Sequence, residues 1–199
     1  MGNTASVPAL APLEALSAAA PIAIDDADRW DAVLAVDPVN STPPEELAAA
    51  SHAFCSELVR NNLESGNLQT LIRKTVDLLQ QAQSMRAKPH VFHQCGSCLF
   101  LLRLFLKHMI ETLEPEALVM HLTDASSSTT LAGVLADALL AALIECELSD
   151  DSYWLHMELS TTLTVSSGRR RAGRTFPWAS ALPDGGGNRC TLQDCAGVH

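Results

Sequence analysis

The stretch Phe54–Leu79, FCSELVRNNLESGNLQTLIRKTVDLL, organises this chain, because a polar turn divides two apolar, helix-like segments. Apolar residues recur at three- and four-residue intervals on both sides of the turn, the spacing of one helix face. We expect Asn61 and Asn62 to end the first helix, and Gly66 and Asn67 to begin the second. The glycine supplies a positive φ and the asparagine side chains cap exposed backbone groups. Such a turn fixes the angle between paired helices, so its predicted role is structural.

Helix signals continue on both sides of this turn. Thr42, Pro43 and Glu45 fit a capping box with proline at the first helical position, and Pro89 and Pro115 mark two further starts. We predict an all-α fold of antiparallel helix pairs on short loops, with helices over about residues 43–61, 68–88, 89–113, 115–122, 131–147 and 153–165. Serial helix pairs build a bundle or an α-solenoid, and without a repeat consensus the apolar pattern does not separate the two.

Composition excludes several functional classes. The chain has 199 residues, of which 47% are hydrophobic and 5% aromatic, a balance that favours helix over sheet. Its net charge of −10 argues against a nucleic-acid binder, which needs a basic face. Six cysteines without regular spacing are too few for a disulfide scaffold, so we expect a reducing compartment. We find no apolar run long enough to span a membrane and no cationic start typical of a secretory signal.

Composition also divides the chain into three segments. Residues 1–27 are rich in Ala, Pro and Ser, which predicts a flexible N-terminal arm. Residues 28–165 carry the helical periodicity and form the predicted helical domain. Residues 166–199 hold five of the 13 basic residues and two of the 23 acidic ones, which leaves a net charge of −13 on the rest. With glycine and proline throughout, this segment is predicted to be a disordered tail foreign to the domain.

The segment His93–Cys98, HQCGSC, resembles a thiol or metal site. A papain-type nucleophile needs a histidine roughly 130–150 residues downstream, beyond the end of this chain, and a thioredoxin-type pair follows a strand, which is not predicted here. A zinc site needs four ligands, and one helix cannot wrap an ion with its own cysteines and histidines. We interpret Cys95 and Cys98 as core residues and predict no catalytic residue, metal or cofactor. A thiol or zinc-dependent enzyme using these cysteines remains the alternative.

The chain begins Met1-Gly2-Asn3-Thr4-Ala5-Ser6, which fits the pattern M-G-x-x-x-[ST]. This pattern predicts N-myristoylation of Gly2 once the methionine is removed. A disordered start that happens to place glycine second is the alternative interpretation.

Several motifs together resemble the N-terminal part of the dymeclin family. DRWDAVL precedes the Phe54–Leu79 block, and HLTD and LADALLAAL follow it. The most specific part is N-N-x-x-[ST]-G-N-L, met here by Asn61, Asn62, Ser65, Gly66, Asn67 and Leu68. The resemblance covers about Trp30 to Val165, with Gly2 added.

The resemblance carries the functional expectations. It implies an N-myristoylated helical-repeat protein with a HEAT- or armadillo-like α-solenoid, acting without enzymatic chemistry in Golgi organisation and vesicle trafficking. The expected location is the cytoplasm, peripheral to the Golgi membrane. The expected partners are trafficking proteins and the membrane surface, with no nucleic acid and no small-molecule substrate. A generic cytosolic helical adaptor is a further alternative.

Dymeclins are much longer, so the resemblance implies that the chain corresponds to their first portion. The helical repeat that would pack against its last helix is then missing. We expect the apolar side of the last helix to be exposed where that neighbour is missing, namely Trp154, Leu155, Leu159 and Leu163.

Overall fold

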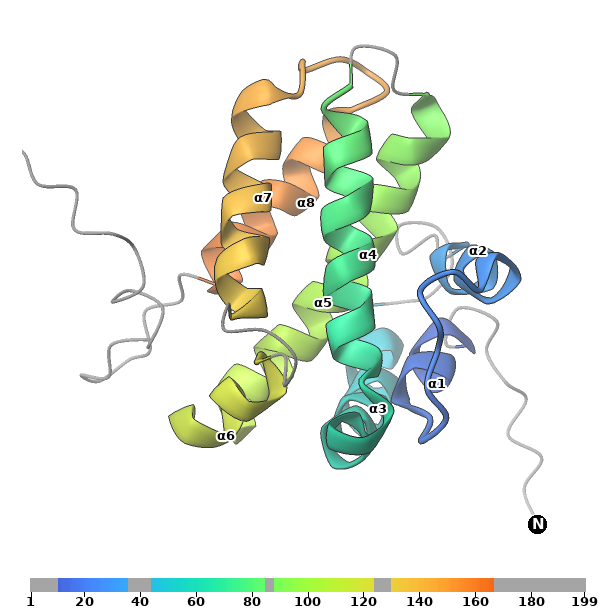
Figure 1. The fold of residues 1–199 in the computed structure, drawn as a ribbon, viewed down its shortest axis with the longest axis vertical. Coiled ribbons are helices and arrows are strands. Elements are labelled where there is room, and N and C mark those ends of the chain that lie inside the picture. Colours follow the sequence, from blue (N-terminus) through green and yellow to red (C-terminus); the bar gives the residue numbers. More distant parts are fainter. Residues whose placement is uncertain (1–10, 36–43, 85–87, 124–129, 167–199) are drawn as a thin grey trace, which may run out of the picture.

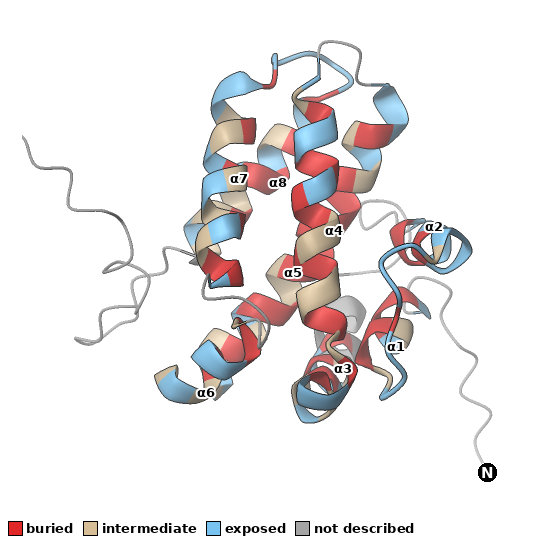
Figure 2. Ribbon diagram, in the orientation of Figure 1, coloured by how far each residue is buried: buried red, intermediate tan, exposed pale blue. Residues whose placement is uncertain are grey.

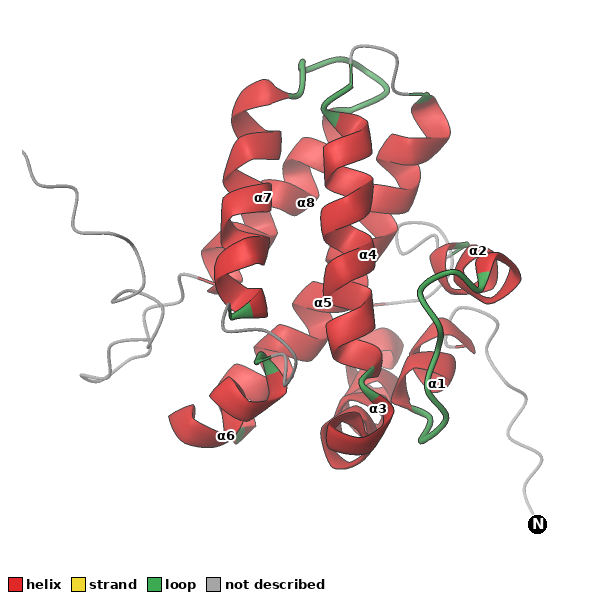
Figure 3. Ribbon diagram, in the orientation of Figure 1, coloured by secondary structure: helices red, strands yellow, loops and turns green. Residues whose placement is uncertain are grey.

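The computed structural model describes residues 11–35, 44–84, 88–123 and 130–166, and its regular elements there are all α-helices (Figures 1 and 3). A single isolated β-bridge joins Thr123 to Thr130. The all-α fold class is therefore confirmed. The helices are α1 (Ala11–Ser17), α2 (Ala27–Leu34), α3 (Pro44–Ser65), α4 (Asn67–Ala82), α5 (Pro89–Thr112), α6 (Pro115–His121), α7 (Leu131–Glu145) and α8 (Tyr153–Ser166).

Two helix hairpins form the centre of the molecule. The first joins α4 to α5 and the second joins α7 to α8. α4 packs beside α7 and runs in the same direction, and α5 packs beside α8 in the same way (Figure 1). The two hairpins are thus stacked with the first helix of one beside the first helix of the other, and the second beside the second. α3 lies across the lower end of the first hairpin, where it contacts α1, α5 and α6.

α5 is the central helix of this arrangement. Proline occupies its first turn, where a missing N–H costs nothing, and Lys88 before it is extended. Buried residues lie on nearly all sides of its middle part, which is expected of a helix surrounded by others (Figure 2). The fully buried apolar residues of α5 are Cys95, Cys98, Leu99, Leu101, Leu102, Phe105, Leu106 and Met109.

A glycine of α5 lies directly against a tryptophan of α8. A Cβ atom built on Gly96 would lie 2.7 Å from two ring carbons of Trp154, which is closer than such atoms can pack. The absence of a side chain at Gly96 therefore sets the distance between the two helices.

The structure differs from the prediction for the N-terminal arm over its described part. Residues 11–17 form α1, whose Leu13 and Leu16 are buried against the body, and Ile22 is buried beyond the helix. In α2, the fully buried Trp30 donates its indole N–H to the carbonyl of Ala23 at 2.9 Å. The Ala- and Pro-rich composition hides these few apolar anchors, so a flexible arm is the wrong description of residues 11–27. Residues 1–10 lie outside the described part.

The prediction of an exposed apolar side on the last helix is also wrong for the residues named. Leu155 and Leu159 are fully buried, and Trp154 and Leu163 are half-buried. Trp154 lies against Gly96 and His93 of α5, a helix that the sequence pattern alone did not place beside α8. In the described residues, no helix is both long enough and apolar enough to cross a membrane.

Candidate functional site: an asparagine-centred junction

The polar turn joins α3 to α4 through a single residue. α3 continues to Ser65, four residues beyond the predicted end at Asn61, and α4 begins at Asn67. Gly66 between them has φ 66° and ψ 16°, the left-handed conformation. Any other L-residue pays roughly 1–2 kcal/mol for that conformation, so glycine lets two helices follow one another with no longer loop.

The Asn67 side chain is the centre of the junction and is fully buried. Its Nδ2 donates to the carbonyls of Leu16 at 3.1 Å, Ala18 at 3.1 Å and Ala20 at 3.0 Å. Its Oδ1 accepts from the backbone N–H of Ile22 at 2.8 Å. One side chain thereby binds the Leu16 carbonyl in the last turn of α1, which has no partner within that helix, and two carbonyls just beyond the helix. We call this set of contacts the Asn67 clamp.

The two asparagines in the last turn of α3 bind different neighbours. Asn61 donates from Nδ2 to the Ser17 carbonyl at 2.8 Å and so adds to the hold on α1. Asn62 is buried, and its Oδ1 accepts from the backbone N–H of Leu68 at 2.8 Å, which caps the start of α4. Its Nδ2 lies 3.1 Å from Nδ1 of His121. The turn is thus bonded to α1, α4 and α6 at once.

His121 is the member of the junction that the sequence did not reveal. It is only 4% exposed, and its carbonyl accepts from Gln69 Nε2 at 3.1 Å. Because Asn62 Oδ1 is occupied by Leu68, the Asn62 amide must present its N–H to the imidazole. His121 Nδ1 therefore accepts, which requires the neutral ring. Burial accordingly lowers the pKa of His121.

Comparison with known proteins gives a family match over most of the chain. A sequence model of the family described as "Dymeclin: Dyggve-Melchior-Clausen syndrome protein" matches residues 1–167. The chain belongs to the dymeclin family. The match includes the N-terminal segment that holds α1, which the resemblance stated from sequence had left out except for Gly2.

Two dymeclins illustrate the relationship. Chicken dymeclin is 31% identical over 166 residues, covering 77% of this chain and 25% of its own length. Mouse dymeclin is 27% identical over 138 residues, covering 64% of this chain and 21% of its own. The chain thus spans about a quarter of the length of these dymeclins. No solved structure matches.

The junction gives this dymeclin-family chain a pH dependence that can be measured. The folded-state pKa of His121 lies below its unfolded value, so between the two the unfolded chain binds more protons. We expect the contribution of His121 to the free energy of unfolding to be greatest above about pH 6.5 and to fall as the pH drops below that value. Urea unfolding followed by circular dichroism at pH 7.5, 6.5 and 5.5 measures this loss.

A second histidine requires a control in that experiment. Burial lowers the pKa of His108 as well, with His52 adding to the shift and Glu111 opposing it. His121→Asn keeps an acceptor near the Nδ1 position and removes the titration, so it should flatten the pH dependence, with His108→Asn measured beside it. An unchanged pH dependence in His121→Asn would place the sensitivity elsewhere.

The predicted core cysteines lie inside this dymeclin-family fold. Cys95 and Cys98 are fully buried in α5. Burial raises the pKa of Cys98 to about 12, against a smaller opposing effect of Thr75, and burial also raises the pKa of Cys95. A buried thiol with a raised pKa is a poor nucleophile. Among the described residues, no group of three or more His, Cys, Asp or Glu side chains is placed to hold a metal ion. The burial of both thiols opposes a nucleophilic role for them.

The packing of these thiols can be tested by substitution. We expect Cys95→Ser combined with Cys98→Ser to lower the free energy of unfolding by about 1–3 kcal/mol, because two hydroxyls would be buried in an apolar core. Urea denaturation measures the loss, and the matched Cys→Ala pair, which buries no hydroxyl, should lose less. Stoichiometric zinc in the wild type that disappears in the double variant would contradict this interpretation.

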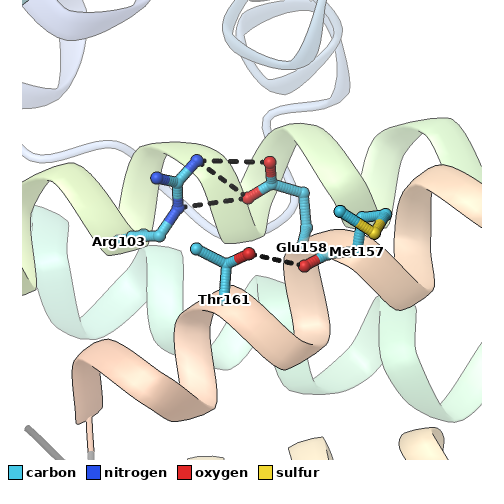
Figure 4. A network of polar contacts seen from close by, with 4 residues as sticks. All are labelled: Arg103, Met157, Glu158 and Thr161. Carbon is cyan, nitrogen blue, oxygen red and sulfur yellow. Dashed lines mark hydrogen bonds and ion pairs between the residues drawn. The ribbon is translucent and has the colours of Figure 1, made fainter.

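A polar contact also joins the two hairpins. Arg103 on α5 faces Glu158 on α8, with Nε to Oε2 and Nη2 to Oε1 both at 3.2 Å (Figure 4). Burial raises the pKa of Glu158, and Arg103 acts in the opposite direction. The fork-to-fork geometry fixes how α8 lies along α5.

The structure therefore brings together Asn61, Asn62, Gly66 and Asn67 in one junction. Gly2 lies outside the described residues. No described feature gives the junction a chemical reaction to perform, and its partners are helix ends and backbone groups.

Proposed function

We propose that this chain is the N-terminal segment of a non-enzymatic peripheral membrane protein that acts in Golgi organisation and vesicle trafficking. The observation that carries the proposal is the family match over residues 1–167, which includes a Met1-Gly2 start suited to myristoylation. Because the chain spans about a quarter of the dymeclins it matches, the activity and partners of the whole protein are part of the proposal.

The stacked hairpins support an α-solenoid as the architecture of that protein. In a solenoid, each helix pair lies beside the next with equivalent helices adjacent. α4 beside α7 and α5 beside α8 follow that rule for one step. Such arrays present long surfaces for protein partners, in keeping with a scaffold that binds trafficking proteins.

The proposed lipid would hold the protein at a membrane only weakly. One myristoyl chain gives reversible binding with a partition constant of roughly 10⁴ M⁻¹, and stable residence needs a second signal. Residues 3–24 contain no Lys, Arg or Cys to supply one. We therefore expect exchange between cytoplasm and membrane, with protein partners selecting the Golgi.

Gly2→Ala tests the anchor. It should abolish incorporation of labelled myristate and shift the protein to the soluble fraction, because acylation requires glycine after the methionine. Thr4→Ala, at a position that the pattern leaves open, is the matched control and should remain acylated.

Two outcomes would remove the anchor from the proposal. One is a wild type that incorporates no myristate, which would leave a generic helical adaptor. The other is a Gly2→Ala variant whose Golgi association equals that of the wild type.

A further inference from the structure

The second hairpin has an apolar face that no described element covers. In α7, the buried stripe that includes Leu135, Leu139 and Ala142 faces the body, whereas Leu140 and Ile144 lie on the opposite side. Ile144 is 80% exposed. A helix of a folded domain normally presents polar residues on its outer side, so this pattern is unusual for a surface helix.

α8 also carries apolar residues on its exposed side. Leu155, Leu159 and Thr162 are buried, and Tyr153 and Met157 project from the opposite side. Leu148, in the connection between the helices, is 65% exposed. The exposed apolar residues of both helices lie opposite their buried residues, on sides that no described element covers. We call the following set the outer face: Leu140, Ile144, Leu148, Tyr153 and Met157.

The charge around the outer face is of one sign. The segment 131–166 contains no Lys or Arg. Its exposed acidic residues are Asp137, Glu145, Glu147, Asp150 and Asp151. An occupant therefore needs apolar side chains at helical spacing together with positive charges beside them.

The interface already present shows the same chemistry. Where α8 meets α5, apolar residues pack at the centre, and Glu158 of the second hairpin pairs with Arg103 of the first. The acidic second hairpin thus contacts the first hairpin through a basic side chain, Arg103. A second copy of the chain docking by this face would instead oppose carboxylate to carboxylate, and an anionic lipid surface would meet the same repulsion.

We propose that the outer face is a docking surface for a basic amphipathic helix. Leu140, Ile144 and Met157 contact its apolar stripe, and the surrounding carboxylates pair with its Lys or Arg residues. This inference goes beyond the proposed function and does not depend on acylation of Gly2.

Binding of synthetic peptides to the full, unacylated chain tests the proposal. One labelled peptide of about 18 residues carries Leu at i, i+3, i+4 and i+7 with Lys beside them, and its twin replaces every Lys with Glu. Fluorescence anisotropy should give a Kd for the basic peptide lower by roughly tenfold or more, with the difference shrinking at high salt.

Substitutions locate the binding. Ile144→Ser combined with Met157→Ser should weaken binding of the basic peptide by roughly tenfold, whereas Leu63→Ser, at an exposed leucine of α3, should leave it unchanged. Circular dichroism establishes that each variant is folded.

Four results would overturn the proposal. They are equal binding of the two peptides, an unaffected Ile144→Ser/Met157→Ser variant, a dimer of the free chain that this variant abolishes, and binding to phosphatidylserine vesicles that it abolishes. The last two would assign the outer face to a second copy or to a membrane.

Discussion

Replacing Asn67 with alanine is expected to lower the free energy of unfolding by about 3–5 kcal/mol, a large loss for a single substitution. The variant leaves the buried carbonyl of Leu16 and the buried N–H of Ile22 without their partner, and it also removes the bonds to the less buried carbonyls of Ala18 and Ala20. Each such group costs about 1–3 kcal/mol, and local rearrangement keeps the total below the sum. Urea denaturation of the wild type and the variant, followed by circular dichroism, measures the difference.

The other asparagines provide graded controls. Asn61→Ala removes one bond from a half-buried side chain and should cost about 1 kcal/mol. Asn67→Asp keeps the acceptor but points a carboxylate at three carbonyls, so it should be no more stable than Asn67→Ala. A loss in Asn67→Ala no greater than that in Asn61→Ala would show that the clamp contributes little.

Gly96→Ala is the second substitution with a large expected effect. The added Cβ would lie 2.7 Å from the Trp154 ring, so α5 and α8 must separate or the indole must move. Overpacking of this kind costs about 1–3 kcal/mol, and we expect the upper part of that range because two helix backbones are involved. Without the clash, the change would stabilise α5 by up to about 1 kcal/mol, since alanine is the better helix former.

A double-mutant cycle separates the clash from other causes. Trp154→Leu makes room beside Gly96, so the loss caused by Gly96→Ala should shrink by at least about 1 kcal/mol in that background. Gly133→Ala in α7 is the control, because its Cβ meets only the Thr130 hydroxyl at 3.3 Å. Additive losses in the cycle would contradict a direct contact between the two sites.

Sequence alone predicted the features that depend on neighbouring residues. The proline that begins each of α5 and α6, the polar turn at Gly66 and the apolar periodicity are local signals, and the helices they predict are present. Cys95 and Cys98 were also placed correctly in the core, because a zinc or thiol site requires ligands or strands that the neighbouring sequence lacks.

What the sequence did not predict depends on distant partners. Asn67 bonds to residues 45 to 51 positions away, and Asn62 meets His121 across 59 positions. An asparagine in a turn has the same local pattern whether it faces water or clamps another helix. For the same reason α1, with few apolar anchors and a partner far along the chain, was predicted as part of a flexible arm.

The Asn67 clamp has a consequence for the proposed lipid. Gly2 stands nine positions before Ala11, the first residue of α1. An extended chain spans at most about 3.3–3.6 Å per residue, so the segment between Gly2 and Ala11 reaches at most roughly 30 Å from the body. A folded body tethered to the bilayer by so short a linker cannot rotate freely beside it. It would hold the α1 end towards the lipid, and the second hairpin, on the opposite side of the molecule in Figure 1, would face the cytoplasm.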